Sequence, residues 1–540
     1  MSWRHLYPVL LVAFPPLALA AHRPTYVGAG DALRVALAVA VTAAVLMAGV
    51  YVLLRLRFPA SRAAGAAAAS ALAAVTAFYA YRPAQVAARL TGAPPVLVVV
   101  AAGTAVGLAA WAVATVAPRR GLGPHAVEAY LTVLGAVMTV WMAGQIGVHE
   151  AAGALAVRRS ALVRELARPV RTRAGAAAPA AARDRDVYVV VLDEYAGAAV
   201  LRERFGYDNT PFEDSLRALG FRVPAVVRSN YPITLLSVPS LLNFAQLRPF
   251  ADEVDHDFQV STPIRHVIDH NRAARFLKGR GYRYVFFGSS WFAATLGSDE
   301  ADVRFGADPD AGTAGALYAS DFRRYFVPRT SLWLLAGRFR SPAEVDAAHA
   351  ARTFAGLRAV AGGARPTFAF AHVLLPHPPW VVDSACRPLR SGSRPTDGWD
   401  GSAAAGTMYV AQVRCVNAQV LATVRAILAR PGPRPVIVLQ GDHGSESLNR
   451  APRDGVLPTA EQNAERYRAF GAYYLPDGGG AALPDTVSVV NVLRYVFAEY
   501  FGADLPPVPD AMYYAYWRPY DMRAVDPDFR VRPGPGGGGR

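Results

Sequence analysis

The distribution of apolar and polar positions divides the chain into two parts. Five apolar runs occupy the first 150 residues, at about 7–21, 32–54, 63–80, 95–117 and 126–147. The second, fourth and fifth runs reach the ~20 residues that a membrane-spanning helix needs. The first run is short and contains Pro15-Pro16, and the third is mostly alanine. We therefore predict a bundle of about five transmembrane helices over residues 1–148.

Two other interpretations of this region fit the sequence less well. The first run also has features of a signal peptide, because Arg4 precedes its apolar core and Ala-Leu-Ala-Ala follows. Four more apolar runs of the same style follow it, which favours a first span. A buried helical domain of a soluble protein would contain scattered charges. The run from Val96 to Val116 contains none, which favours a membrane.

The arginines suggest an orientation for this bundle. Residues 1–150 contain ten arginines, against the acidic residues Asp31, Glu128 and Glu150. With five spans and the N-terminus inside, six arginines flank the inner ends and four the outer ends. This topology places everything after about residue 148 outside the cytoplasm, and one span fewer reverses it. Residues 149–185 are expected to form a juxtamembrane helix and linker.

From residue 187 the pattern changes to short β-branched runs that alternate with helical stretches. Strands are predicted at 187–192, 284–287, 367–372 and 435–440, and helices between them, for example at 211–219 and 409–428. Such alternation is typical of an α/β domain with a mainly parallel sheet covered by helices on both faces. We predict that this domain covers residues 186–530 and that the Gly/Pro-rich tail 531–540 is disordered.

Acidic residues and histidines follow these strands. Asp193-Glu194 ends the first run, His377 follows the third, and Asp442-His443 ends the last. The carboxyl ends of parallel strands carry the functional site in open α/β sheets. An Asp after a strand is also a common turn former or helix cap. Two such pairs at strand ends nevertheless favour one shared site for Zn²⁺ or Mn²⁺, which carboxylates and imidazoles bind.

Hydroxyl side chains precede an apolar helical stretch in the segment Thr234-Leu-Leu-Ser237-Val-Pro239-Ser240. A hydroxyl near a metal ion and a helix N-terminus has a lowered pKa and is a candidate nucleophile. Capping preferences place Ser237 at the N-cap, with Pro239 in the first turn and Thr234 one turn earlier. The alternative is an ordinary helix cap without chemistry.

Taken together, these motifs resemble the alkaline phosphatase/sulfatase superfamily, and specifically its membrane-anchored branch of lipid A phosphoethanolamine transferases and lipoteichoic acid synthase. The strand that ends in Asp193-Glu194 is similar to the branch's first metal-ligand strand. Gly441-Asp442-His443-Gly444 is similar to its second metal motif. Thr234 matches the metal-bound threonine nucleophile of the phosphoethanolamine transferases. The anchors occur in the family's order over residues 186–500.

This resemblance implies a membrane-anchored hydrolase or transferase that acts on phosphate, or alternatively sulfate, esters. It implies an alkaline-phosphatase-like domain outside the bacterial cytoplasmic (inner) membrane and a substrate that is a membrane lipid or an envelope glycan. It also implies a divalent metal, Zn or Mn, with Ca or Mg as alternatives. The implied catalytic residues are Thr234 and His377, the metal ligands are Asp193, Glu194, Thr234, Asp442 and His443, and the further candidate substrate-binding residues are Ser237, His372 and Arg466.

The sequence also departs from the family pattern. Sulfatases need a C/S-x-P-x-R motif, and Ser237-Val-Pro-Ser-Leu241 has the proline but lacks the arginine. The transferases carry a further histidine shortly after Asp-His-Gly, whereas none lies between His443 and Tyr474. A catalytically silent envelope protein that keeps the fold as a binding module is therefore the alternative function.

The net charge of +15 does not alter the predicted fold or function. The arginines follow membrane flanks and linkers, and no nucleic-acid motif accompanies them, so no nucleic-acid partner is expected. Cys386 and Cys415 are the only cysteines, and under the predicted topology both lie in the exported domain. An oxidising compartment would allow them to form a disulfide. Two unpaired thiols are the alternative.

Overall fold

The computed structural model of the chain divides into two compact units. The helical unit comprises residues 1–153 and 316–340, and the sheet unit comprises residues 154–315 and 341–540. Residues 174–184 of the predicted linker and residues 533–540 of the predicted disordered tail lie outside the described residues. The structure describes residues 2–25, 28–92, 94–116, 124–173, 185–290, 295, 297–305, 320–333, 341–360, 365–389, 398–448 and 456–532.

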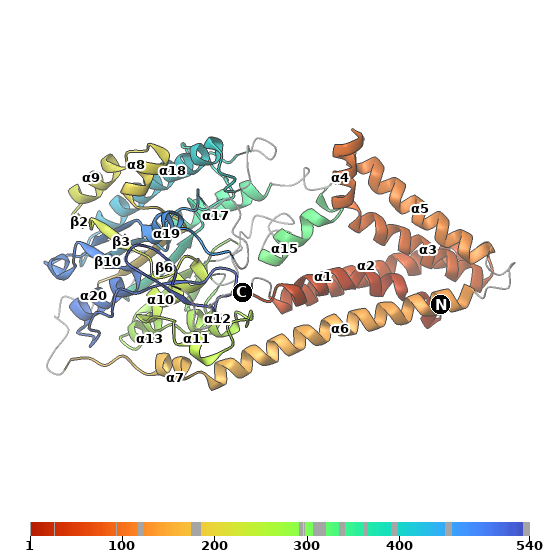
Figure 1. Cartoon of the computed structure of the whole chain (residues 1–540), viewed down its shortest axis with the longest axis horizontal. Helices are drawn as coiled ribbons and strands as arrows, with labels where there is room; N and C mark the ends of the chain where they lie inside the picture. Colours follow the sequence, from red (N-terminus) through yellow and green to blue (C-terminus); the bar gives the residue numbers. More distant parts are fainter. Residues whose placement is uncertain are drawn as a thin grey trace. The chain divides into compact units, whose positions relative to one another are not determined.

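The helical unit is built from the apolar runs, drawn in red and orange in Figure 1. Four of its described helices, α2, α3, α5 and α6, are long and apolar enough to cross a membrane. The first run forms α1, which has 16 residues and is shorter than a typical span. Its elements are η1 (Trp3–His5), α1 (Tyr7–His22), α2 (Ala29–Arg55), α3 (Ala60–Tyr79), α4 (Tyr81–Thr91), α5 (Pro95–Val116), α6 (Pro124–Arg159), α15 (Asp321–Phe326) and η6 (Val327–Arg329).

The sheet unit contains a mainly parallel sheet, which confirms the fold class predicted from the sequence. Among the described residues this sheet has seven strands in the order β2-β9-β7-β1-β6-β4-β5. The pairs along β7-β1-β6-β4-β5 are parallel, and β9 is antiparallel to both β7 and β2. The strands are β1 (Val187–Leu192), β2 (Phe221–Arg222), β4 (Arg283–Phe287), β5 (Val303–Phe305), β6 (Thr367–Val373), β7 (Val436–Gly441) and β9 (Gly471–Tyr474).

Two smaller sheets and a set of helices complete the sheet unit. The smaller sheets are formed by β3 (Val226–Arg228), β8 (Arg468–Ala469) and β10 (Thr486–Ser488), and by β11 (Met512–Tyr514) and β12 (Arg523–Val525). The helices are α7 (Ala161–Ala167), α8 (Ala198–Phe205), α9 (Thr210–Ala218), α10 (Thr234–Asn243), α11 (Phe250–Glu253), α12 (Thr262–Asp269), α13 (Arg272–Lys278), α17 (Pro342–Ala359), α18 (Ala403–Leu428), α19 (Ala460–Tyr467), η7 (Gly479–Ala482) and α20 (Val489–Phe501).

The core of the sheet unit lies on both faces of the main sheet, because side chains alternate along each strand. Tyr188, Val190 and Leu192 of β1 pack on one side, in the cluster that includes residues of α8, α9, α17 and α18. Val187 and Val191 pack on the other side, with residues of α10, α13 and α20. A fully buried apolar side chain contributes about 1.5–3 kcal/mol. The apolar run therefore fixes β1 at the centre of the domain.

Candidate metal centre

The strand register brings three sequence motifs to one edge of the main sheet. Leu192, the last residue of β1, pairs with Gly441 of β7 on one side and Val373 of β6 on the other. The residues that follow these three strands therefore emerge side by side. Asp193 and Asp442 are the first residues beyond β1 and β7. The backbone N–H of His377 donates to the carbonyl of Asp193 at 3.1 Å, which holds the third motif against the first.

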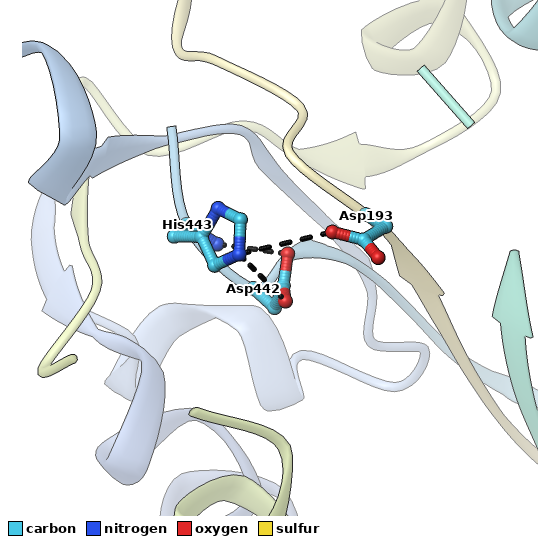
Figure 2. Close-up of side chains that lie close together, drawn as sticks. All are labelled: Asp193, Asp442 and His443. Carbon is cyan, nitrogen blue, oxygen red and sulfur yellow. Dashed lines mark hydrogen bonds and ion pairs between the residues drawn. The ribbon is translucent and has the colours of Figure 1, made fainter. Parts of the chain in front are cut away.

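Three of the predicted ligands lie together at this edge. One ligand atom from each of Asp193, Asp442 and His443 lies within 4.8 Å of the others, and all three residues are buried. His443 Nε2 is 3.3 Å from Asp442 Oδ2 and 3.7 Å from Asp193 Oδ1. Figure 2 shows the imidazole of His443 facing both carboxylates. The structure thus joins residues that are about 250 positions apart in the sequence.

Both glycines around Asp442-His443 are required by the approach of other backbone segments. A Cβ atom on Gly441 would lie 2.5 Å from the carbonyl oxygen of Tyr195. A Cβ atom on Gly444 would lie 2.2 Å from the carbonyl oxygen of Glu465. These distances are far below van der Waals contact, so a larger residue would displace the backbone that carries the ligands.

Thr234 completes this group. Its Oγ1 lies 3.2 Å from His443 Nε2 and 3.3 Å from Asp193 Oδ1. Helix α10 begins at Thr234, with Ile233 as the N-cap, so the prediction that Ser237 caps the helix is wrong. The run Leu235-Leu236 is buried in the core, and this burial outweighs the capping preference of serine. The threonine hydroxyl therefore sits at the positive end of the helix dipole.

Ser237 lies one turn further along α10 and faces the backbone of the metal motif. Its Oγ donates to the carbonyl of Asp442 at 2.6 Å, and Ser229 Oγ donates to the same carbonyl at 2.6 Å. Ser237 is buried, and its hydroxyl is engaged in this contact. The hydroxyl that faces the acidic group is that of Thr234, and Ser237 fixes the position of Asp442.

The hydrogen bonds of His443 define which of its nitrogens carries the proton. Nδ1 lies 3.1 Å from the carbonyl oxygen of Gly444, and a carbonyl can only accept, so Nδ1 donates. Burial, together with the charge of Arg466, lowers the pKa of His443 well below its usual value. The ring is therefore neutral, and Nε2 presents a lone pair to Asp193 and Asp442.

This donor set fits a divalent cation. Lone pairs from one imidazole and two carboxylates face one another in a buried site, an arrangement that a cation stabilises. Asp442 Oδ2 is buried and has no hydrogen-bond partner among the described residues. Burial and the charge of Asp193 raise the pKa of Asp442 to about 7. A bound cation would offset the electrostatic repulsion between the two carboxylates.

Glu194, a predicted ligand, is turned away from this group. Its backbone is left-handed, with φ +62°, and its N–H donates to Asp442 Oδ1 at 3.1 Å. Its carboxylate Oε2 lies 3.4 Å from His377 Nε2 and 3.4 Å from Arg466 Nη1, and Oε1 accepts from Trp399 Nε1. The structure therefore does not include Glu194 in the group formed by Asp193 and Asp442. Because the backbone of Glu194 is left-handed, its carboxylate points in a different direction from that of Asp193.

Arg466 is a buried partner of Glu194. It donates from Nε to the carbonyl of Pro232 at 2.7 Å and from Nη1 to the carbonyl of Gly444 at 3.1 Å. Glu446 Oε2 lies 3.9 Å from the same Nη1. Arg466 thereby links the segment before Thr234, the loop after His443 and the carboxylate of Glu194. All of these contacts lie within the sheet unit.

The two remaining histidines differ in exposure. The side chain of His377 is 29% exposed, and it is the most accessible of the predicted catalytic and metal-ligand side chains. Burial alone would lower the pKa of His377, but the charges of Asp193 and Glu194 raise it above its usual value. His372 is completely buried, with Nε2 3.3 Å from Asp193 Oδ2 and Nδ1 2.6 Å from Thr295 Oγ1. It orients Asp193 and does not face a surface that a substrate can reach.

Sequence reasoning missed several partners of the site. Trp399 contacts Glu194, and Tyr516 donates to Glu446 Oε2 at 2.9 Å. Glu465 accepts from Ser445 Oγ at 2.6 Å and from two backbone N–H groups of the loop that follows His443. None of these residues is part of a sequence motif, and they reach the site only through the folding of the chain.

Cys386 and Cys415 form a disulfide in the structure.

Comparisons with known proteins add weak similarities. No family model and no curated protein matches the sequence. Among solved structures, the periplasmic domain of EptC from Escherichia coli, in complex with Zn, is 13% identical, with a TM-score of 0.41 over 64% of this chain and 93% of its own. The lipoteichoic acid synthase LtaP from Listeria monocytogenes is 12% identical, with a TM-score of 0.39 over 67% of this chain and 90% of its own.

A third similar structure is the soluble domain of lipooligosaccharide phosphoethanolamine transferase A from Neisseria meningitidis. It is 14% identical, with a TM-score of 0.36 over 63% of this chain and 93% of its own. These proteins are of the kinds that the sequence motifs resemble. At such scores they transfer neither a residue role nor a substrate to this chain, whose function is argued from its own residues.

Proposed function

We propose that this protein is a membrane-anchored, metal-dependent phosphoester hydrolase or transferase in which Thr234 is the nucleophile. The observation that carries the proposal is the position of Thr234 Oγ1, within 3.3 Å of both Asp193 and His443 at the start of α10. A hydroxyl placed among buried ligand atoms at a helix N-terminus combines the features that favour attack on an anionic ester.

Asp193, Asp442, His443 and the Thr234 oxygen would hold the cation, and their oxygen and imidazole donors suit Zn²⁺ or Mn²⁺. When bound there, the cation would lower the pKa of the Thr234 hydroxyl and offset charge on the phosphoryl oxygens. Ser237 and Ser229 position Asp442 through its carbonyl, and His372 positions Asp193. Arg466 holds the segment before Thr234 and the loop after His443 in place.

The reaction proceeds in two displacement steps. Thr234 gives its proton to water, its Oγ1 attacks the phosphorus in line, and the bond from phosphorus to the leaving oxygen breaks. His377, whose pKa is raised, donates a proton to that leaving oxygen. Water or an acceptor hydroxyl then gives its proton to His377 and attacks the phospho-threonine. The bond from Thr234 to phosphorus breaks, and the threonine recovers its proton.

The apolar helices suggest where the substrate comes from. Four helices long enough to span a bilayer would keep the catalytic domain at a membrane surface. With α1 as a fifth span, the N-terminus lies inside and the sheet unit outside the cytoplasmic membrane. A phosphate ester of an envelope lipid or glycan is the substrate class that fits this location.

The test is turnover of a chromogenic phosphodiester by the full chain in detergent, with Mn²⁺ or Zn²⁺ added. Thr234→Ala should reduce kcat by at least about 10³-fold, in the range seen when catalytic nucleophiles are removed. Thr407→Ala is a matched control, because Thr407 is exposed on α18 and its hydroxyl bonds only within its own helix. Intact-mass detection of a phosphoryl adduct on the wild type, absent in Thr234→Ala, would identify the intermediate.

Two results would contradict the proposal. If Thr234→Ala retains wild-type turnover, the threonine is not the nucleophile. If the purified chain binds no divalent metal and chelation leaves its stability unchanged, a silent binding protein becomes the better description. Circular dichroism of each variant separates loss of chemistry from loss of fold.

A further inference from the structure

A short segment from the second half of the chain is part of the helical unit. Helix α15 and η6 lie within residues 316–340, which group with the membrane-capable helices. Arg323 donates from Nη2 to Asp31 Oδ1, at the start of α2, at 3.0 Å. The backbone N–H of Ser331 donates to the carbonyl of Phe78, near the end of α3, at 2.8 Å. The segment therefore rests on the end of the unit where α2 begins and α3 finishes, as Figure 1 shows for α15.

Aromatic side chains are concentrated at this end. Phe326 packs against Phe78 and Tyr79, with ring centroids 6.3 and 6.2 Å apart. Trp333 packs against the buried cluster that includes Tyr81 at the start of α4. Tyrosine and tryptophan collect at the depth where apolar helices leave the bilayer for water. The composition assigns this end of the helices to a membrane–water interface.

Three arginines gather at the same level without a negative partner. The Cζ atoms of Arg23 and Arg329 lie 5.6 and 5.4 Å from the centroid of the one Tyr325 ring. Burial, followed by the charges of Arg82 and Arg23, lowers the pKa of Arg329. Among the described residues, no ion pair involves any of these three arginines, whereas Arg323 pairs with Asp31.

We propose that Arg23, Arg82 and Arg329 form a binding site for the phosphate group of an anionic phospholipid. Planar guanidinium groups bind phosphate oxygens through paired hydrogen bonds. Basic side chains beside a bilayer attract anionic headgroups, and here the aromatic side chains place them at headgroup depth. A bound phosphate would neutralise the mutual repulsion of the three cations. The occupant is a lipid headgroup, because Arg23 and Arg82 lie just past the ends of the apolar helices α1 and α3. This site is separate from Thr234 and does not depend on the proposed catalytic function.

The test is native mass spectrometry of the delipidated full chain in detergent, titrated with phosphatidylglycerol. The triple variant Arg23→Gln/Arg82→Gln/Arg329→Gln should lose about tenfold or more of the affinity for this lipid. The control removes the same number of charges at the opposite ends of α2 and α3, with Arg55→Gln, Arg57→Gln and Arg62→Gln, and should retain the tight lipid adduct. The single variant Arg82→Gln, at an exposed position, should weaken binding about threefold or more without affecting the fold.

Equal losses in the two triple variants would overturn the site, because binding would then follow total charge. Unchanged affinity in the properly folded Arg82→Gln variant and in the Arg23/Arg82/Arg329 triple variant would overturn it as well. Inorganic phosphate is the competing source of the same chemistry. If it displaces phosphatidylglycerol at equal concentration, the lipid assignment is wrong, whereas failure to compete supports it. Diacylglycerol, which lacks the phosphate, should show no preference between wild type and variants.

Discussion

Replacing Arg466 with methionine tests whether the buried guanidinium organises the candidate metal centre. The substitution removes a cation 3.4 Å from Glu194 and leaves the carbonyl of Pro232 without its side-chain donor, while the carbonyl of Gly444 keeps the N–H of His443 Nδ1. Breaking a buried ion pair by removing one partner costs about 3–5 kcal/mol. The loss of the donor to Pro232 adds up to about 1–3 kcal/mol unless water replaces the guanidinium. We expect a loss of at least about 3 kcal/mol of unfolding free energy.

A double-mutant cycle separates the ion pair from the other contacts. In Arg466→Met, the carboxylate of Glu194 stays buried with only His377 as a cationic partner. Glu194→Gln on that background removes the unpaired charge. The double variant should therefore be more stable than the sum of the single effects predicts, by about 2 kcal/mol. The carbonyls of Pro232 and Gly444 lose the guanidinium in both Arg466 variants, so this loss cancels in the cycle.

The assay is urea unfolding of the full chain in detergent, followed by tryptophan fluorescence. Arg468→Met is a matched control, because Arg468 stacks on Phe529 with its Cζ 5.3 Å from the ring centroid. We expect a cost of about 1 kcal/mol or less for the control. If Arg466→Met costs no more than Arg468→Met, or if the cycle is additive, the guanidinium does not organise the centre and the reasoning is refuted.

Three further predictions concern the cation group, its backbone and the disulfide. Asp442→Asn should abolish stabilisation by added Zn²⁺ or Mn²⁺ yet raise the melting temperature of the metal-free chain, since an amide N–H can donate to the neighbouring imidazole. Fluorimetry with and without EDTA measures both changes in melting temperature. A lower melting temperature of the variant in EDTA would contradict the prediction. Gly444→Ala should cost about 3 kcal/mol in urea, because its Cβ would lie 2.2 Å from a carbonyl oxygen. Gly398→Ala should be neutral, because nothing lies within 4 Å of a Cβ atom placed there. Equal losses of unfolding free energy in the two variants would refute the argument. Reducing the bond between Cys386 and Cys415, 29 positions apart, should cost about 3 kcal/mol, and an unchanged urea midpoint would count against a stabilising disulfide.

The positions of β1, β4, β6 and β7 could be predicted from the sequence because their signal is local. Uninterrupted β-branched runs have no other stable place than the centre of a sheet, and parallel pairing brings their carboxyl ends to one edge. That rule alone predicts that Asp193 lies close to Asp442 and His443. The start of α10 could not be predicted in the same way, because the burial of Leu235 and Leu236 overrides the capping preference of Ser237. Capping is worth about 1 kcal/mol, which core burial exceeds.

The placement of residues 316–340 also lay beyond local patterns. This segment has no apolar run of the length that marks a membrane element, and its attachment depends on a few contacts. Phe322 and Phe326 are buried in the helical unit, and Arg323 pairs with Asp31, which lies almost 300 positions earlier. Pairings of single residues over such separations leave no periodic signal in the sequence. They become visible only once the chain is folded.

The adjacent acids Asp193 and Glu194 show how one backbone angle divides the roles in the site. Both follow β1, so sequence reasoning treats them as equivalent ligands. The left-handed conformation of Glu194 turns its carboxylate towards Arg466, while Asp193 faces His443. A second divalent cation beside Glu194 would have to compete with a guanidinium already held by two carbonyl oxygens. The geometry therefore gives the two acids different partners, the imidazole of His443 for Asp193 and the guanidinium of Arg466 for Glu194.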